Sequence, residues 1–405
     1  MDATTAATDF SPPRRLLLGP GPSLVHPRVL RTLSLPLIGH LDPVFLTMMD
    51  EIQELLRNTF RTSNPLTLAV SGTGSAGMEA AIVNVIEPGD TVVVGIHGAF
   101  GGRLASMVER CGGHALRVEA PWGGIIDRDV LRATMSKAGR IKAVALVHAE
   151  TSTGVSQPLE GVSALCREHG ALLIVDAVTS LAGMPLEVDA WGIDVCYSGT
   201  QKCLSCPPGL APLTLSPRAC EVMRRRKTPC RSWYFDLMLV SDYWTEGKRV
   251  YHHTAPISML YGLREALRLV HEEGLSARFA RHRANSFALA AGLTELGLLP
   301  LPADEHQLPM LSCVRLPDHI DEAAIRGILL QEYGIEIGGG LGPLKGKVWR
   351  IGLMGESSQQ AHVLTLLNAL EDVFARSGWL MNPGIAVQAA VQAFRTPRES
   401  IRSPA

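Results

Sequence analysis

The sequence has almost no surplus of charge of either sign. Its 405 residues include 38 lysines and arginines against 39 aspartates and glutamates, which gives a formal net charge of −1 at pH 7. A protein whose main partner is nucleic acid needs a strong positive field to neutralise phosphates. The balance argues against that class. The single dense basic run, Arg224–Lys227, is typical of the solvated end of a helix.

Long apolar stretches are also missing. No uninterrupted apolar segment has the length that a bilayer-spanning helix needs. The start of the chain, MDATTAATDFSPPRR, lacks the apolar core of a secretory signal peptide. We therefore expect a cytoplasmic protein with no membrane partner.

Cysteine is scarce, with eight residues and no regular spacing. Cys203 and Cys206 form a CxxC, which is half of a common zinc motif, but no second CxxC or HxxxH accompanies it. We expect reduced cysteines that act as small apolar side chains in a chain without a metal site.

Apolar strands alternate with helices through the first two thirds of the sequence. This alternation predicts an α/β domain whose mostly parallel sheet is covered on both faces. From Ala255 onward helices dominate, and an α+β pattern follows. We expect an extended segment over 1–30, a large domain over 31–275, a smaller C-terminal domain over 276–380 and a tail over 381–405. The expected strands of the large domain are LTLAV, TVVVG, HALRV, AVALVHA, ALLIVDA and DVCYSG, and the helices between them lie near 102–112, 127–138 and 160–169.

Gly72, Gly74 and Gly77 match the dinucleotide-binding pattern GxGxxG between a strand and a helix. That pattern also requires an acidic residue about 20 residues on, at the end of the next strand. Here TVVVG runs into Ile-His-Gly, which disfavours a dinucleotide. The amides of residues 73–75, at the N-terminus of the helix, instead suit one phosphate group.

A lysine and an aspartate follow two other strands. Lys202 stands among small and polar residues in YSGTQKCLSCPPG, where a core strand runs into a loop. Asp176 follows the strand LLIV. Pyridoxal phosphate needs a lysine to bind its aldehyde, an acid for its ring nitrogen and a phosphate cup. The three features together suggest this cofactor.

Several longer motifs carry a family resemblance. From about residue 14 to 378 the chain resembles the class V aminotransferases of fold type I, most of all the alanine–glyoxylate and serine–pyruvate type. The resemblance implies pyridoxal phosphate as cofactor, a seven-stranded, mostly parallel sheet with a smaller α+β domain, and a homodimer with shared active sites. The motifs are LLLGPGPS, NPLTLAVSGTGSAGMEAA, EPGD, HAETSTGV, LLIVDAVTSL, GIDVCYSGTQKCLSCPPG, YHHTAPISMLYGLREAL and GGGLGPLKGKVWRIGLMG.

The resemblance implies the two catalytic residues. Lys202 resembles the lysine that holds the cofactor and carries the proton, and Asp176 resembles the partner of the pyridine nitrogen. Arg350 resembles the arginine that binds the substrate carboxylate.

Further residues resemble cofactor ligands. Phe100 replaces the tryptophan that usually stacks on the cofactor ring, and Thr151 replaces a serine that bonds the phenolic oxygen. The residues that resemble phosphate ligands are Thr73, Gly74, Ser75 and Gln201 within the chain, and Tyr251 and Thr254 from a second subunit.

The implied reaction moves the amino group of L-alanine or L-serine to glyoxylate or pyruvate. No extra cation is obviously placed for a side-chain carboxylate, which favours these donors over aspartate or glutamate. One alternative is an (S)-ureidoglycine–glyoxylate aminotransferase, although His40 and His253 fit the alanine type. A cysteine desulfurase typically has histidine where Gln201 stands. A third alternative is a non-catalytic nucleotide-binding module, in which Asp176 and Lys202 would have no functional role.

Overall fold

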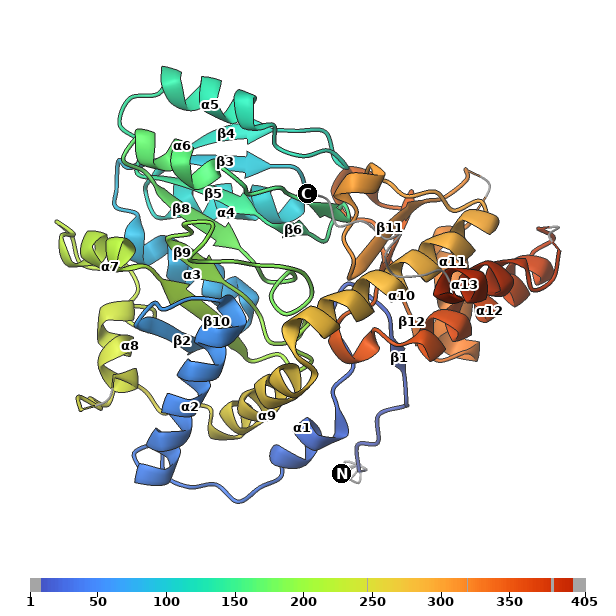
Figure 1. The fold of residues 1–405 in the computed structure, drawn as a ribbon, viewed down its shortest axis with the longest axis horizontal. Helices are drawn as coiled ribbons and strands as arrows, with labels where there is room; N and C mark the ends of the chain where they lie inside the picture. Colours follow the sequence, from blue (N-terminus) through green and yellow to red (C-terminus); the bar gives the residue numbers. More distant parts are fainter. Residues whose placement is uncertain (1–8, 246, 319, 380–381, 396–405) are drawn as a thin grey trace, which may run out of the picture.

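A large α/β domain and a smaller domain lie side by side in the computed structural model (Figure 1). The structure describes residues 9–245, 247–318, 320–379 and 382–395. Helix α10 (Leu275–Glu295) runs from the end of α9 in the large domain into the smaller one, so it belongs to both sides of the boundary. None of the helices in these ranges is both long and apolar enough to cross a membrane.

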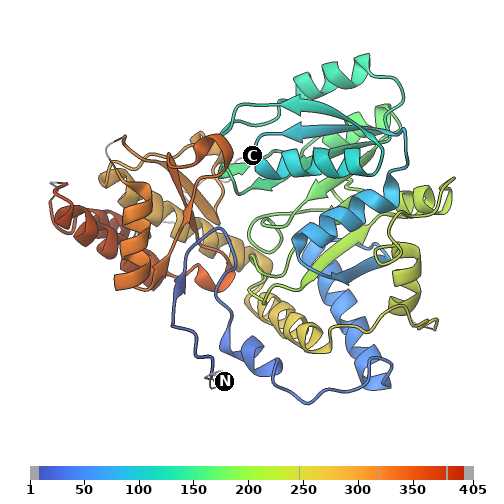
Figure 2. The same ribbon diagram turned by 180° about the vertical axis from the view of Figure 1, so that it is seen from behind.

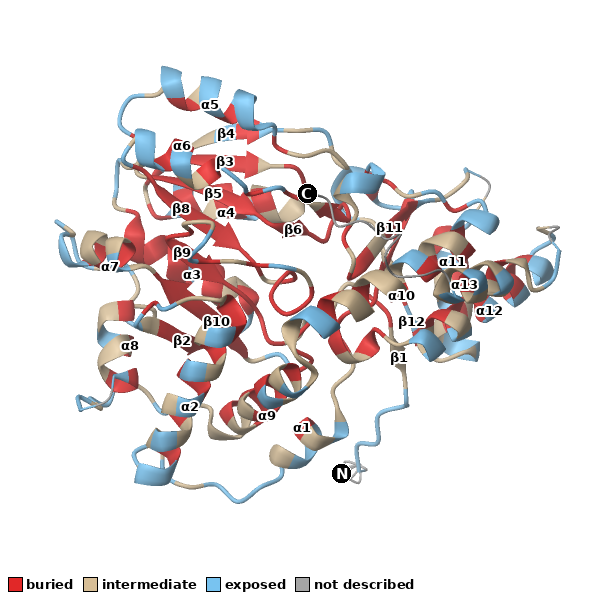
Figure 3. Ribbon diagram, in the orientation of Figure 1, coloured by how far each residue is buried: buried red, intermediate tan, exposed pale blue. Residues whose placement is uncertain are grey.

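The large domain is built on one seven-stranded sheet. Its strand order is β2-β10-β9-β8-β5-β3-β4, and β10 alone runs antiparallel to its neighbours. The inner strands are buried on both faces, which explains their continuous apolar sequences (Figure 3). The predicted sheet is confirmed. Its strands are β2 (Leu66–Ser71), β3 (Thr91–Ile96), β4 (His114–Glu119), β5 (Ala143–Val147), β8 (Leu172–Asp176), β9 (Val195–Tyr197) and β10 (Leu210–Leu215), beside a short hairpin of β6 (Ala149–Glu150) and β7 (Val155–Ser156).

Helices cover both faces of this sheet. The expected helices are present, although α4 begins at Ala99, three residues before the predicted start. Helix α7 ends at Arg224, and Arg224 and Arg225 pair with Glu221, so the basic run is a helix end, as predicted. The helices are α1 (Pro27–Thr32), α2 (Pro43–Phe60), α3 (Gly74–Val85), α4 (Ala99–Arg110), α5 (Arg128–Lys137), α6 (Val162–Glu168), α7 (Pro217–Arg224), α8 (Leu237–Trp244) and α9 (Ile257–Glu273).

The smaller domain packs helices against a three-stranded antiparallel sheet with the order β11-β14-β13. The N-terminal segment joins it, because β1 pairs in parallel with β12 (Figure 2). Its elements are β1 (Leu16–Leu17), β11 (Leu311–Arg315), β12 (Ile335–Glu336), β13 (Gly338–Gly339), β14 (Val348–Gly352), α11 (Glu322–Glu332), α12 (Gln360–Arg376) and α13 (Ile385–Arg395), with single 3₁₀ turns at Asp304–His306, Gly342–Leu344 and Gly355–Ser357.

The sequence predicts a tail over 381–405, but its central part is helix α13, which packs on α10 and α12. Ala386 and Ala390 are fully buried. A Cβ at Gly292 of α10 would lie only 2.8 Å from the carbonyl oxygen of Ala386, so the two helices approach closely through small residues. The packed residues Val387, Ala390 and Phe394 of α13 recur at helical spacing, a signal that the sequence analysis overlooked. Residues 396–405 lie outside the described residues.

Candidate active site

One cavity lies at the carboxyl ends of the parallel strands, where ligands of open α/β sheets bind. Eight of the residues that the sequence predicts to hold the cofactor line it, which brings together positions from five separate segments of the chain. The lining residues are Thr73, Gly74, Ser75, Met78, Phe100, Arg103, Val147, Ala149, Thr151, Asp176, Val178, Thr179, Gln201 and Lys202.

Lys202 lies beneath the N-terminal segment. Its Nζ donates a hydrogen bond to the carbonyl oxygen of Pro20. A Cβ at Gly21, where φ is +104°, would lie 2.6 Å from that Nζ, so only glycine fits there. The hydroxyl of Ser23 donates to the carbonyl oxygen of Lys202 at 2.8 Å. Burial lowers the pKa of Lys202 to about 8, which makes the neutral amine accessible near neutral pH.

Asp176 is the last residue of β8 and is almost completely buried. Its Oδ1 accepts a hydrogen bond from the amide of Val178 at 2.8 Å, and its Oδ2 accepts one from the hydroxyl of Tyr197 at 3.0 Å. Burial raises the pKa of Asp176 to about 6, although these hydrogen bonds and the charge of Lys202 act in the opposite direction. The carboxylate therefore favours a cationic partner in the cavity.

Hydrogen-bond donors gather at the start of α3. Thr73 is the N-cap residue, and its hydroxyl makes no bond to the helix. The first amides of a helix have no acceptor within it, and the helix dipole adds positive charge at this end. Gln201 Oε1 is buried without a hydrogen-bond partner within the described residues, and because an amide oxygen only accepts, Gln201 can bind an anion only through its NH₂ group. This end of the cavity therefore suits an anion.

Phe100 and Arg103 form a pair on the first turns of α4. The guanidinium carbon of Arg103 lies 4.9 Å from the centre of the Phe100 ring, and its Nη1 donates to Ser75 Oγ at 3.0 Å. The sequence reasoning missed Arg103 and found no extra cation at the site. Its spacing of three residues from Phe100 on a helix was the available signal, because such residues are neighbours.

A second missed residue, Glu150, fixes the backbone of Phe100. Glu150 is fully buried. Its Oε2 accepts hydrogen bonds from the amides of Phe100 at 3.1 Å and Gly101 at 3.2 Å. A carboxylate at a helix N-terminus satisfies amides that lack helical partners and interacts favourably with the dipole. Glu150 is therefore the N-terminal anchor of α4.

Arg350 approaches the edge of the cavity from the smaller domain. It lies on β14 and is 7% exposed. Its Nη1 donates to the carbonyl oxygen of Thr151 at 3.3 Å, and its Nε donates to the carbonyl oxygen of Gly339 at 2.7 Å. Arg350 does not line the cavity itself, but its guanidinium contacts the backbone of a residue that does.

Tyr251 and Thr254 do not join the cavity of their own chain. They precede α9, and the Tyr251 side chain is exposed. The Tyr251 ring lies 5.2 Å from the ring of His40, and His253 Nε2 lies 3.0 Å from Ser71 Oγ. The two predicted phosphate ligands therefore face outward, with two histidines beside them.

The residues around the cavity fit pyridoxal phosphate from end to end. The N-terminus of α3, with its free hydroxyl and amides, matches the phosphate. The buried carboxylate of Asp176 matches the ring nitrogen, and the ring of Phe100 offers a stacking face. Lys202, with its lowered pKa, matches the aldehyde. No groups of three or more histidine, cysteine or acidic residues suited to a metal occur in the described ranges.

Known proteins match the chain over most of its length. The family model for class V aminotransferases matches residues 38–348. A crystal structure of alanine–glyoxylate aminotransferase from Nostoc sp. superposes with a TM-score of 0.90 at 51% identity and covers 91% of this chain and 97% of that one. The (S)-ureidoglycine–glyoxylate transaminase of Bacillus subtilis is 43% identical over 401 residues, covering 94% of this chain and 96% of that protein. The alanine–glyoxylate aminotransferase of Drosophila melanogaster is 39% identical over 369 residues, covering 90% and 93%. The chain therefore belongs to the class V aminotransferase family and is a pyridoxal phosphate-dependent enzyme.

Proposed function

We propose that this enzyme transfers the amino group of L-alanine or L-serine to glyoxylate or pyruvate. One observation carries the proposal. A lysine of lowered pKa, a buried carboxylate and a helix N-terminus line the same cavity, with an arginine of the smaller domain at its edge. Each of these groups has a task in transamination, and a simple binding module would need only the helix N-terminus.

Lys202 is the residue that we assign to covalent attachment and proton transfer. Bound pyridoxal phosphate supplies an electron sink for the bond that breaks at the substrate Cα. Once free of the cofactor, the amine of Lys202 would take the proton from the substrate Cα and deliver it to the C4′ atom of the cofactor. A pKa of about 8 suits a group that both accepts and donates a proton near neutral pH. When it is not bound to the cofactor, this amine donates a hydrogen bond to the carbonyl oxygen of Pro20.

Asp176 supplies the fixed negative charge of the site. Its two oxygens are held by Val178 and Tyr197, so the carboxylate cannot rotate away from the cavity. A carboxylate in this position keeps the ring nitrogen protonated, which strengthens the electron sink.

We assign the remaining cofactor contacts from the resemblance to the family, and the residues concerned line the cavity. Phe100 stacks on the ring, and the Thr151 hydroxyl bonds the phenolic oxygen. Arg103 adds positive charge at the phosphate end through its contact with Ser75. The residues that we assign to the phosphate are Thr73, Gly74, Ser75 and Gln201.

Arg350 binds the substrate carboxylate in this proposal. A bidentate guanidinium–carboxylate pair contributes about 1.5–3 kcal/mol and fixes the orientation of the amino acid. The contact with the Thr151 carbonyl brings the guanidinium to the cavity edge and leaves part of its donor fork for a ligand.

We further propose a homodimer in which Tyr251 and Thr254 complete the phosphate site of the second subunit. Their outward position supports this, because a phosphate in their own cavity is out of contact with them. A cytoplasmic location, expected from the sequence, also remains a proposal. The free state of all eight cysteines is compatible with a reducing compartment.

An (S)-ureidoglycine donor is the alternative. The Bacillus relative with that name is 43% identical, whereas the Nostoc structure named for alanine is 51% identical. His40 and His253 favour the alanine type. Steady-state rates with glyoxylate and L-alanine, L-serine or (S)-ureidoglycine separate the two readings. A kcat/KM at least tenfold higher for ureidoglycine than for alanine or serine would replace the proposed donor.

A further inference from the structure

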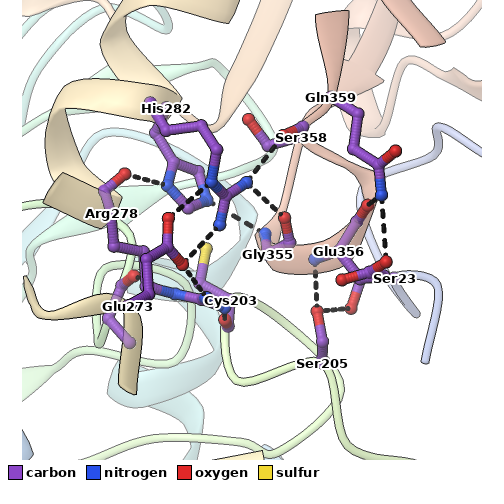
Figure 4. Close-up of polar contacts among 12 residues, drawn as sticks. Ser23, Cys203, Ser205, Glu273, Arg278, His282, Gly355, Glu356, Ser358 and Gln359 are labelled. Atoms are coloured by element: carbon purple, nitrogen blue, oxygen red, sulfur yellow. Dashed lines mark hydrogen bonds and ion pairs between the residues drawn. The ribbon is translucent and has the colours of Figure 1, made fainter. Parts of the chain in front are cut away.

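The loop that carries Lys202, residues 198–209 between β9 and β10, is called the lysine loop. A residue outside the large-domain sheet holds its backbone. Arg278, in the first turn of α10, is 6% exposed. Its Nη2 donates to the carbonyl oxygen of Cys203 at 2.6 Å, one residue after Lys202, and its Nε donates to the carbonyl oxygen of Ala182 at 3.1 Å. Its Nη1 pairs with Glu273 at 2.6 Å (Figure 4). One guanidinium therefore ties two large-domain loops to the start of the bridging helix.

Glu273 also binds a second arginine, which holds a different loop. Arg281 pairs with Glu273 through Nε at 2.6 Å. Its Nη1 donates to the carbonyl oxygens of Gly355 at 2.9 Å and Ser358 at 2.6 Å. The 3₁₀ turn that contains Gly355 follows β14, the strand that carries Arg350. The carboxylate of Glu273 thus joins Arg278, which holds the lysine loop, to Arg281, which holds the loop after β14.

His282 lies one turn after Arg278 on the same face of α10 and contacts both Arg278 and the loop after β14. Its Nδ1 lies 2.8 Å from the carbonyl oxygen of Arg278, and its Nε2 accepts a hydrogen bond from the amide of Gly355 at 2.9 Å. Both contacts are satisfied by a neutral imidazole with its hydrogen on Nδ1. Burial and the charges of Arg278 and Arg281 lower the pKa of His282 to about 3, so the neutral form persists at physiological pH.

The two loops also touch directly. A Cβ at Gly355 would lie 2.1 Å from Ser205 Oγ and 2.7 Å from the carbonyl oxygen of Cys203. Ser205 Oγ accepts a hydrogen bond from the amide of Glu356 at 2.7 Å. The loop after β14 is therefore seated on the lysine loop, and displacement of either one disturbs the other.

We propose that Arg278 and Arg281 are positioning residues of the transamination site, coupled through Glu273. Arg278 fixes the backbone that carries Lys202, and Arg281 fixes the loop behind the strand that carries Arg350. The inference rests on the proposed function, because it assigns each arginine to a different step of the proposed transamination. Arg278 serves the proton transfer by the lysine, and Arg281 serves the binding of the amino acid.

Four variants test the proposal in the full-length holoenzyme. Arg278→Gln removes the fork to Cys203 and Ala182, and Arg281→Gln releases the loop after β14. Arg278→Lys keeps the charge but offers a single donor centre that cannot span the same three acceptors. Arg283→Gln is the matched control, because Arg283 lies on the same helix and its side chain makes no hydrogen bond or ion pair with the residues that the structure describes.

Steady-state kinetics with L-alanine and glyoxylate should separate the two roles. For Arg278→Gln we expect kcat to fall about tenfold or more with KM for alanine within about twofold, because a group acting in the chemical step is displaced. For Arg281→Gln we expect KM for alanine to rise about fivefold or more with a smaller change in kcat. Each rate is divided by the concentration of bound cofactor, so that a smaller amount of folded enzyme does not lower the measured kcat.

Hydrogen–deuterium exchange of the cofactor-free protein gives a readout that needs no activity. The peptide covering residues 201–206 should exchange faster in Arg278→Gln and at the wild-type rate in Arg283→Gln. If Arg278→Gln does not fold, Arg278→Lys replaces it in both measurements. If Arg278→Lys has the wild-type kcat and the wild-type exchange rate at residues 201–206, the guanidinium fork is not required, and that part of the proposal is overturned.

Three further results bear on the proposal. Unchanged kcat and KM per bound cofactor in both glutamine variants would mean that the network serves stability only, and would overturn it. Additive effects in the double variant would overturn the coupling through Glu273, because residues of one network are expected to be non-additive. Faster exchange at 201–206 together with failure of every proposed donor would leave the positioning of the loop standing and reject the proposed substrates.

Discussion

Tyr197 donates a hydrogen bond to Asp176 across two neighbouring strands, with an oxygen–oxygen distance of 3.0 Å. The two residues are also paired in register between β9 and β8. Burial and the adjacent carboxylate raise the pKa of Tyr197 well above its usual value, so its hydroxyl keeps the proton and remains a donor. The sheet itself therefore fixes the orientation of the carboxylate at the base of the cavity.

We expect Asp176→Asn to bind cofactor somewhat more weakly and to lose most of its transamination. The phosphate site stays intact, whereas the ring nitrogen loses its negative partner. Single-turnover spectra with L-alanine measure the half-reaction directly. A rate within about tenfold of wild type, roughly 1.4 kcal/mol in the barrier, would exclude Asp176 as the electronic partner.

The same substitution should stabilise the cofactor-free protein at high pH. Asp176 has a pKa of about 6 in the fold against 3.8 when unperturbed. The native state therefore binds more protons between these values, and the contribution of Asp176 to stability falls as pH rises through this window. At pH 8 its burial as a carboxylate costs about 3 kcal/mol, which asparagine avoids.

Urea unfolding of wild type and Asp176→Asn at pH 5 and pH 8 tests this pH dependence. The advantage of the variant should be greater at pH 8 by about 1 kcal/mol. His148 and His282, whose pKa values are lowered to about 4 and about 3, destabilise the fold as pH falls below 6.5. They are common to both proteins, so the difference between the two curves isolates Asp176. An equal advantage at both pH values would contradict the raised pKa.

Lys202→Ala should fold and bind cofactor without a covalent link. Reduction of the wild-type holoenzyme with borohydride, followed by peptide mapping, should place the pyridoxyl group on the peptide that contains Lys202. The variant should yield no labelled peptide. A pyridoxyl group on another lysine of the wild-type enzyme would disprove the assignment of Lys202 as the lysine that binds the cofactor.

Glu150→Gln should weaken cofactor binding by loosening Phe100. Each carboxylate oxygen of Glu150 accepts hydrogen bonds, from Phe100 and Gly101 on one side and from Ser152 on the other. The glutamine NH₂ must face one of these sets of donors, which costs about 1–3 kcal/mol.

Cofactor titration of the apoenzyme, with Glu160→Gln as the exposed control on a nearby loop, measures this effect. We expect weaker binding of pyridoxal phosphate in Glu150→Gln and no change in the control. An affinity equal to that of wild type would show that the orientation of Phe100 does not depend on Glu150.

Complementation tests the shared active site. One variant carries Lys202→Ala, and the other carries Tyr251→Phe with Thr254→Val. Refolding them as an equal mixture makes half of the dimers mixed, and about a quarter of all sites should recover, because each mixed dimer contains one site with all three wild-type residues. Absence of recovery, with mixed dimers confirmed by native mass spectrometry, would reject ligands in trans and leave the lysine chemistry untouched.

The sequence by itself determined the sheet and the core of the site. Asp176 ends one buried strand, Lys202 follows another, and Thr73 lies between a strand and a helix. The carboxyl ends of parallel strands meet at one edge, so the order of the elements already brings such residues together. Two elements of the fold were not predicted. Strand β10 contains Pro212, which argues against a central strand. Helix α13 has apolar residues at helical spacing, a signal that the sequence analysis overlooked.

Only the tertiary structure decided which side chains hold the site in place. Arg350 contacts Thr151 across 199 positions of sequence, Glu150 anchors Phe100 across 50, and Arg278 reaches Cys203 across 75. The sequence around each of these residues does not indicate which distant residue it contacts. A hydrogen bond forms only where donor and acceptor meet within about 3 Å at a suitable angle, and distant segments reach that precision only through the packing of the two domains.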